Sequence, residues 1–253
     1  MPEDDFNISF LFTLRPEEAV KYFEKKGYTL SWDWQEVWKE AHNKAFTVAK
    51  VMKLDILQDI HDEMLKALDE GETYEDFKRN LRPTLKDQGW WGKVPASEVP
   101  GYDPKSGVPP DKMVQLGSPQ RLETIYRTNL RTSINAGRYK TQMEQKDDRP
   151  YLQYLQVQRP NKRPAHAELH LKVFRIDDHI INKIYPPNGW GCDCRFRNLS
   201  KDELKSLGLK VTGGDNIVYE PETGWDYNPG QDSFEPDLTG YDKKLVKAYN
   251  KAG

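Results

Sequence analysis

The sequence predicts an α+β fold, in which an N-terminal helical region precedes a mixed core with one long helix and a small antiparallel sheet. Three observations support this prediction. Apolar residues recur at helical spacing through much of the first 90 positions. A Ser-Pro pair then opens a long amphipathic segment. Short segments rich in aromatic and β-branched residues, separated by Pro and Gly, follow from residue 151.

Two helices are expected before residue 50. Pro16 suits a first helical turn and Gly27 suits a stop, so a short helix is predicted from Pro16 to Lys26. The next stripe has apolar residues every three or four positions, as expected for a helix that faces a core: Trp34, Val37, Trp38, Ala41, Ala45 and Val48.

Two more helices are expected before residue 92. A second stripe runs to Gly71 and consists of Ile56, Ile60, Met64 and Leu68. Thr73 then caps another helix, with Asp76 in the capping-box position and with Phe77 and Leu81 facing inward. Pro83 is expected to kink or end that helix, because proline removes a backbone donor.

The composition changes at residue 93. Prolines alternate with glycines up to residue 117, which predicts an extended linker or a partner-binding arm. We therefore expect a helical region at 1–92, a linker or arm at 93–117 and an α+β domain at 118–230. A tail at 231–253 would carry a short amphipathic helix near Asp242 to Ala252.

Ser118 and Pro119 open the long helix as N-cap and first-turn residues. Its expected buried stripe consists of Leu122, Ile125, Tyr126, Leu130 and Ile134. Beside it, Arg127, Arg131 and Arg138 fall within roughly 40° of one another on a helical wheel. This arginine row suits contact with a phosphate backbone or an acidic partner, or else a solvated edge.

The basic residues are unevenly distributed along the chain. From Arg121 to Arg175 there are twelve basic and five acidic residues, although the whole chain has a net charge of -2. A local positive excess can attract phosphate or an acidic protein surface. The same excess is also compatible with an ordinary solvated face.

The remaining elements of the α+β domain are short. Strands are expected from Tyr151 to Arg159 and from Cys192 to Arg197, with a helix from Pro164 to Leu171 between them. Ser200 and Glu203 form a capping box for a helix that Gly208 ends. Residues 209–220 are expected to hold strands turned at a Gly-Gly pair.

Composition excludes some classes of protein. Apolar residues are 36% of the chain and charged residues are 31%, so modest cores and long polar surfaces are expected. No run approaches the roughly 18–20 apolar residues of a membrane span. The acidic N-terminus and a single Cys-x-Cys pair are unlike a secreted disulfide framework, so folding in a reducing cytoplasm is expected.

Residues 163–197 concentrate the reactive side chains. His166 and His170 would share one helical face, and Cys192 and Cys194 would point the same way from a strand. Two imidazoles and two thiolates are the donors of a structural zinc site, so these four residues are candidate zinc ligands. No other cofactor is expected.

Three other interpretations of the segment stay open. The cysteines could be small buried hydrophobes, with the histidine bonded to backbone and Trp190 packed above them. They could instead form a strained disulfide. In a metal-free nuclease, His166 could act as general base while Arg127, Arg163 or Tyr185 steadies a phosphate. Asp177 and Asp178 could alternatively hold a divalent cation.

Four segments together resemble the phage Mu F-like head morphogenesis family of minor capsid proteins. They are GSPQRLETIYRTNLRTSINAGRYK (117–140), RPYLQYL (149–155), RPAHAELHLKVFRIDD (163–178) and YPPNGWGCDCRFR (185–197). DQGWWGK (87–93) and GWDYNPG (224–230) extend the likeness on both sides. The resemblance implies that one turn is a structural signature of the family. Its residues are Pro186, Pro187, Gly189 and Trp190.

The resemblance implies a non-enzymatic protein of the phage or prophage head. Such a protein would assemble in the host cytoplasm and lie in the head interior near the portal vertex. Portal protein, scaffold or major capsid protein and phage DNA would be its partners, and no membrane would be involved. Arg127, Arg131, Arg138 and Arg163 would then contact DNA or a protein partner. The alternative is a nuclease or toxin-like domain carried in the head.

Overall fold

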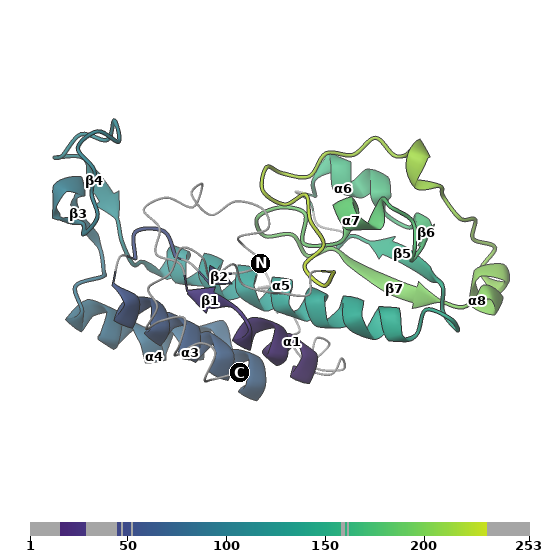
Figure 1. Cartoon of the computed structure of the whole chain (residues 1–253), viewed down its shortest axis with the longest axis horizontal. Helices are drawn as coiled ribbons and strands as arrows, with labels where there is room; N and C mark the ends of the chain where they lie inside the picture. The colour runs from purple at the N-terminus through teal and green to yellow at the C-terminus, as the bar shows by residue number, and fades with distance from the viewer. Residues whose placement is uncertain are drawn as a thin grey trace, which may run out of the picture.

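The computed structural model describes residues 16–28, 45–46, 48–51, 53–157, 160 and 162–231. Two hydrophobic cores lie along one long helix, α5 (Pro119–Glu144). Helices α1, α3 and α4 pack against α5, and a small sheet with short helices lies near the C-terminal end of α5 (Figure 1). The predicted α+β class is confirmed, with the long helix and the small antiparallel sheet in place.

The first core is largely helical. Its helices are α1 (Pro16–Glu24), α3 (Leu54–Glu70), α4 (Tyr74–Asp87) and the first half of α5. Ile56, Ile60 and Met64 are buried on α3, as their spacing predicts. Gly71 ends that helix in the left-handed conformation, with φ 71°.

Helix α4 begins as predicted and ends later than predicted. Thr73 and Asp76 form the capping box, and Phe77 and Leu81 are buried. Of the two expected effects of Pro83, an end to the helix is wrong, because the helix continues to Asp87. Pro83 is exposed, so water can satisfy the carbonyl that loses its partner, while the fully buried Leu85 holds the last turn against the core.

The predicted stripe from Trp34 to Val48 lies mostly outside the described residues. Its described end is not helical, because β2 (Ala45–Phe46) pairs in parallel with β1 (Gly27–Tyr28). Phe46 is buried against Phe23 of α1, with ring centroids 5.5 Å apart. The helix expected near Asp242 to Ala252 also lies outside the described residues.

Residues 93–117 form a compact arm. Strand β3 (Lys93–Pro95) pairs with the antiparallel β4 (Met113–Gln115), and the 3-10 turn η3 (Ala96–Glu98) follows β3. Apolar side chains of the arm join the first core: Ala96, Val99, Val114 and Leu116. Figure 1 shows the arm at the end of the molecule opposite the sheet. The two cores therefore meet on α5 and not at this segment.

Helix α5 begins where the Ser-Pro pair predicts. The Ser118 hydroxyl accepts a hydrogen bond from the Arg121 amide at 3.2 Å. Helix α1 packs closely against its second half, where a Cβ on Gly137 would lie 3.0 Å from the Ala19 nitrogen. The pair Lys140–Glu18 adds an ionic contact between the same two helices.

The second core contains a three-stranded antiparallel sheet. Its order is β6 (Val173–Arg175), β5 (Tyr151–Leu155) and β7 (Arg195–Leu199), so β5 is central. Leu152 of β5 pairs with Phe174 of β6 and with Asn198 of β7. Tyr154 pairs with Phe196 of β7. Alternation along β5 thus places Leu152 and Tyr154 in the core.

Short elements complete this half of the molecule. They are α6 (Pro164–Leu169), α7 (Ile181–Ile184), α8 (Lys201–Ser206) and the 3-10 turn η4 (Gly214–Asn216). The capping box of Ser200 and Glu203 is confirmed on α8. The strands expected over residues 209–220 are wrong, since a single bridge from Val211 to Val173 replaces them. No helix in the described part of the chain is long and apolar enough to cross a bilayer.

Candidate functional site

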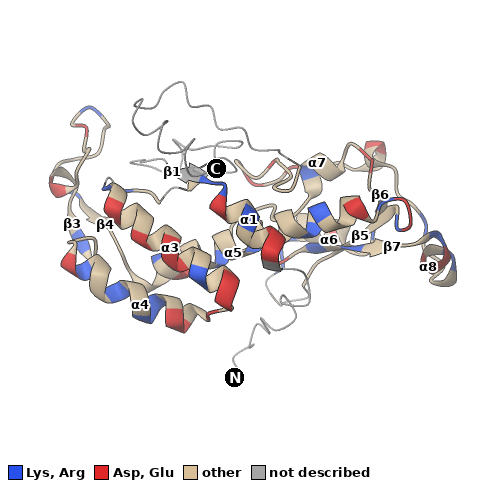
Figure 2. Cartoon of the chain, turned by 60° about the horizontal axis from the view of Figure 1, so that its bottom comes forward, with Lys and Arg blue, Asp and Glu red and all other residues tan. Residues whose placement is uncertain are grey.

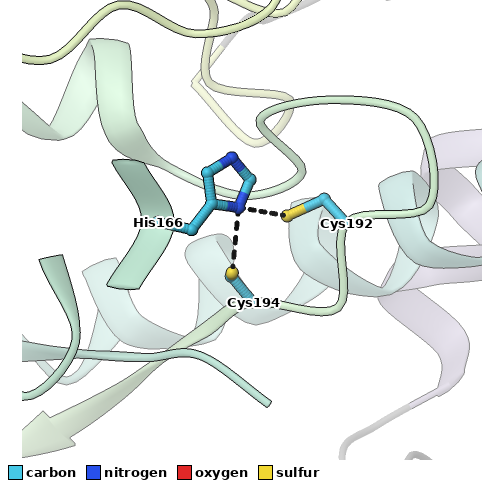
Figure 3. A group of neighbouring side chains, drawn as sticks. All are labelled: His166, Cys192 and Cys194. Carbon is cyan, nitrogen blue, oxygen red and sulfur yellow. Dashed lines mark hydrogen bonds between the residues drawn. The ribbon is translucent and has the colours of Figure 1, made fainter. Parts of the chain in front are cut away.

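Three of the four predicted metal ligands meet in the second core. His166 lies on α6, and Cys192 and Cys194 lie in the loop between α7 and β7. Their donor atoms all lie within 4.8 Å of one another, and all three residues are buried. The His166 Nδ1 atom is 3.4 Å from the Cys194 sulfur and 3.8 Å from the Cys192 sulfur. Figure 3 shows this ring nitrogen directed toward both sulfurs.

Local sequence explains how His166 arrives there. Pro164 occupies the first turn of α6, where a missing amide hydrogen costs little. Leu169, three residues after His166, is also buried and packs in the second core. Because residues three apart share a helical face, the leucine that anchors α6 also turns the histidine inward.

Asp193, between the two cysteines, points to a different partner. Its carboxylate forms an ion pair with Arg131 of α5, and the two side chains are only 6% and 9% exposed. Successive residues of an extended segment alternate in direction, so the flanking thiols face His166 while Asp193 faces α5. The Cys-Asp-Cys triplet therefore joins α6 to α5.

The Pro-Pro-Asn-Gly-Trp turn that precedes the cysteines is built on Asn188. Its side-chain amide donates to the Tyr185 carbonyl at 3.2 Å, and its Oδ1 accepts from the Tyr154 hydroxyl at 3.1 Å. Pro186 and Pro187 are joined by a cis peptide bond and are buried. Asn188 thus connects the turn to the central strand of the sheet.

Glu222 closes the other side of the turn. It accepts from the Trp190 amide at 3.0 Å and pairs with Arg163 Nε at 2.7 Å. A Cβ on Gly189 would lie 2.5 Å from Glu222 Cδ, so only glycine fits there without movement. Trp190 packs edge-to-face on Trp225, with ring centroids 5.3 Å apart. The family-like Gly224–Gly230 segment therefore supports the turn.

The two thiols have different electrostatic environments. The hydrogen bond from Cys194, together with the His166 ring, lowers the pKa of Cys192 well below its usual value. The same hydrogen bond and burial raise the pKa of Cys194. Burial and the neighbouring cysteines raise the pKa of Tyr154. The cluster therefore favours one thiolate at Cys192, beside a phenol that stays protonated.

The assignment of His170 as a fourth ligand is wrong. His170 follows the last helical residue of α6, and its Nδ1 accepts from the Gln156 amide at 3.1 Å. The helix ends at Leu169, and the C-cap His170 has non-helical backbone angles, so it leaves the face of His166. Among the residues that the structure describes, the cluster consists of His166, Cys192 and Cys194 alone.

The predicted arginine row is divided by burial. Arg127 is about 39% exposed and pairs with Glu123 at 2.8 Å. Arg131 and Arg138 are buried, the first against Asp193 and the second donating to Asn135 at 2.9 Å. Burial also lowers the pKa of Arg138. Arg131 and Arg138 are therefore not accessible to DNA or to a partner surface in this conformation, because the second core covers that face of α5.

The local positive excess is also largely neutralised. Acidic residues distant in the sequence pair with the basic segment: Glu18 with Lys140, Asp193 with Arg131, Glu203 with Arg149 and Glu222 with Arg163. Acidic and basic positions likewise mix along α4, whereas α3 is mainly acidic (Figure 2). Charge counted along a segment therefore overstated the charge that the folded surface presents.

The proposed catalytic arrangement does not assemble. The His166 ring is 4% exposed and faces two thiols, so a polymer cannot reach it in this conformation. The Tyr185 hydroxyl is buried and donates to Gln142 at 2.7 Å. Asp178 accepts from the amides of Ile180 and Gly214, and Asp177 pairs with Arg175. The two aspartates therefore already have structural partners.

Several residues around the cluster escaped the sequence interpretation. Alternation within Cys-Asp-Cys could have placed Asp193 opposite the thiols. The period of β5 could likewise have placed Tyr154 on the buried face. Nothing in the sequence pattern indicates Glu222, or Tyr219, whose ring lies 6.0 Å from the His166 ring, because both arrive from an irregular segment after the sheet.

Comparison with known proteins identifies the family. The sequence profile described as phage Mu protein F like protein matches residues 58–197, from α3 to β7. The chain belongs to the phage Mu protein F-like family. It is 40% identical over 277 residues to a protein of Escherichia phage Mu named as capsid assembly protein F, covering 98% of this chain and 60% of that protein.

A second relative comes from a bacterial genome. The Mu-like prophage FluMu F protein of Haemophilus influenzae is 40% identical over 252 residues, covering 88% of this chain and 58% of that protein. The chain thus spans about 60% of the length of the curated relatives it matches. No solved structure matches it significantly.

Proposed function

We propose that this chain is a non-enzymatic head morphogenesis protein that acts in assembly of a tailed-phage or prophage capsid. The observation that carries the proposal is the family match across both cores, from α3 to β7. The name of the phage Mu relative supports the same role. The buried His166 cluster adds support, because it favours a structural over a catalytic use of the reactive residues.

We further propose that the protein acts in the head interior near the portal vertex after assembly in the host cytoplasm. Portal protein, scaffold or major capsid protein, and packaged DNA are its proposed partners. Arg127 and Arg163 are each more than a third exposed, so they remain the candidates for DNA or acidic-partner contact. The arm extends from the first core (Figure 1), and its strand β4 carries the exposed Met113, which suits a protein contact.

The proposal is tested in the phage itself. Disruption of the gene should abolish infectious particles, and electron microscopy should show few or aberrant heads, while the wild-type gene in trans should restore them. Normal numbers of DNA-filled, infectious heads without the protein would contradict an assembly role. Immunogold labelling of purified virions then tests location, with label at the single tail-bearing vertex expected.

The contact residues need a matched pair of variants. Arg127→Gln and Arg79→Gln each remove one exposed arginine from an intrahelical ion pair, on α5 and α4 respectively. We expect fewer infectious particles per assembled head for Arg127→Gln and no change for Arg79→Gln. Equal infectivity of the two variants would eliminate Arg127 as a contact residue without affecting the assembly role.

The enzymatic alternative has its own test. Purified protein is incubated with single- and double-stranded DNA and with RNA, with and without Mg²⁺. We expect no cleavage, because His166 is buried. Cleavage that is lost in a folded His166→Ala variant would replace the proposed function with a nuclease.

A further inference from the structure

The geometry of the buried Cys2His cluster matches the requirements of a metal ion. Sulfur and nitrogen donors of one tetrahedral zinc ion lie about 2.3 Å and 2.0–2.1 Å from it, which places them about 3.6 Å apart. The two Nδ1–sulfur distances, 3.4 and 3.8 Å, lie on either side of this value. An imidazole and two thiolates are also the soft donors that zinc prefers over hard cations.

The three donors are held in place by contacts outside the cluster. Leu169 anchors α6, and the Arg131–Asp193 pair fixes the residue between the two cysteines. Asn188 fixes the turn that leads into them. His166 lies 26 and 28 residues before the two cysteines, and each of the two segments is held by its own contacts. Such support for the ligating side chains is characteristic of preorganised metal sites.

We propose that His166, Cys192 and Cys194 bind one zinc ion, which ties α6 to the loop between α7 and β7. These residues supply three of the four ligands of a tetrahedral ion. Tyr154 lies beside the cluster with its hydroxyl donating to Asn188 Oδ1, so it acts as a neighbour of the site and not as the fourth ligand.

The role of the ion is structural. All three protein ligands are buried, each at most 4% exposed, and they join α6 to the loop between α7 and β7. Metal binding to such a cluster is coupled to folding, because the unfolded chain does not hold the donors together. The inference is independent of the proposed role in the phage head.

The first test measures metal in the intact protein. The full chain is purified under reducing conditions without chelators, and zinc is quantified by mass spectrometry before and after saturation with ZnCl2 and removal of the excess. We expect about one equivalent per chain. Cys194→Ser should bind less than about a tenth of that amount. His170→Ala should bind the full amount, because His170 belongs to the same segment and lies outside the cluster.

A second test covers variants that fail to fold. Zinc-depleted wild-type protein is titrated with Co²⁺, and absorption reports thiolate coordination directly. A thiolate-to-cobalt charge-transfer band that saturates at one equivalent, and that zinc then displaces, is expected. A folded wild-type protein with less than about a tenth of an equivalent of zinc after saturation and no such band would overturn the proposal.

Discussion

The two cores along α5 differ in what holds them together. The first is largely aliphatic and aromatic, from Phe23 on α1 to Leu130 on α5, and its buried polar side chains are Lys26 and His61 among the described residues. The second adds buried polar and ionic groups to its apolar residues, among them Arg131, Arg138, Gln142, His166 and Asn188. Burial of hydrocarbon is nondirectional, whereas each buried polar group needs a specific partner. The first core is therefore stabilised mainly by close packing of apolar side chains. The second depends in addition on specific hydrogen bonds and ion pairs.

This difference predicts how each half responds to damage. Removal of atoms from the first core leaves a cavity that its neighbours can partly fill. Removal of one partner in the second core leaves a charge or a polar atom without compensation. Three of the family-like segments, 149–155, 163–178 and 185–197, contribute side chains to the second core.

The largest effect is expected for Asp193→Ala. Loss of the carboxylate leaves Arg131 buried without its ion-pair partner, which costs about 3–5 kcal/mol in the free energy of unfolding. Urea denaturation followed by circular dichroism measures the change. The double variant Arg131→Met, Asp193→Leu should recover most of the loss, because neither charge remains. If the double variant recovers no stability, the loss in Asp193→Ala does not come from the unpaired charge of Arg131.

A cavity in the first core should cost slightly less. Leu85 is fully buried at the end of α4, so Leu85→Ala should lower the free energy of unfolding by about 2–5 kcal/mol. Leu207→Ala is the matched control, because Leu207 is 53% exposed and should change stability little. If zinc content falls together with stability in Leu85→Ala, the two cores are coupled more strongly than their composition suggests.

The first core also holds a buried histidine near Lys26, and burial lowers the pKa of Lys26 itself to about 7. His61 is buried, and its ring stacks on Phe23 at 4.8 Å. Burial lowers the pKa of His61, so the folded state binds fewer protons than the unfolded state below about pH 6.5. Stability due to this residue is therefore complete above pH 6.5 and declines as the pH falls below it.

Replacement of His61 by Phe removes that proton linkage. The loss of stability between pH 7 and pH 5 should become smaller by on the order of 1 kcal/mol, as measured by thermal unfolding at both values. The exposed neighbour in the variant Asp62→Asn serves as a control for charge. An unchanged pH profile in His61→Phe would assign the acid sensitivity to the carboxylates instead.

The smallest effect is expected for Arg127→Gln. The exposed Arg127–Glu123 pair should contribute no more than about 1 kcal/mol, since solvent screens it. Arg131→Gln, four residues along the same row, should cost several times more. Equal losses for these two variants would contradict the division of the row by burial.

Local chemistry explains which parts of the fold were predictable. Ser118, Thr73 and Ser200 cap their helices as the sequence predicts, because a cap depends on residues only two or three positions away. The central strand is also predicted, although it ends at Leu155 and not at Arg159. Pro83 misled the prediction, because the tertiary contact of Leu85 outweighs the local cost.

Long-range placement explains what could not be predicted. The convergence of His166, Cys192 and Cys194 was expected from residue type, but His170 was included because the end of α6 is not encoded by an obvious stop. The arginine row was correct as a helical stripe and wrong as an exposed surface. A helical wheel gives the direction of a side chain and carries no information about what packs on that side.

Helix α5 belongs to both cores and has no break within its 26 residues, a length of about 39 Å. There is consequently no hinge along this stretch, and the arm and the Cys2His cluster are mounted on a single rigid strut. A partner that binds the arm at one end of α5 would therefore also fix the orientation of the sheet at the other end. In a shell built from repeated subunits, such a strut would set a distance between two attachment points.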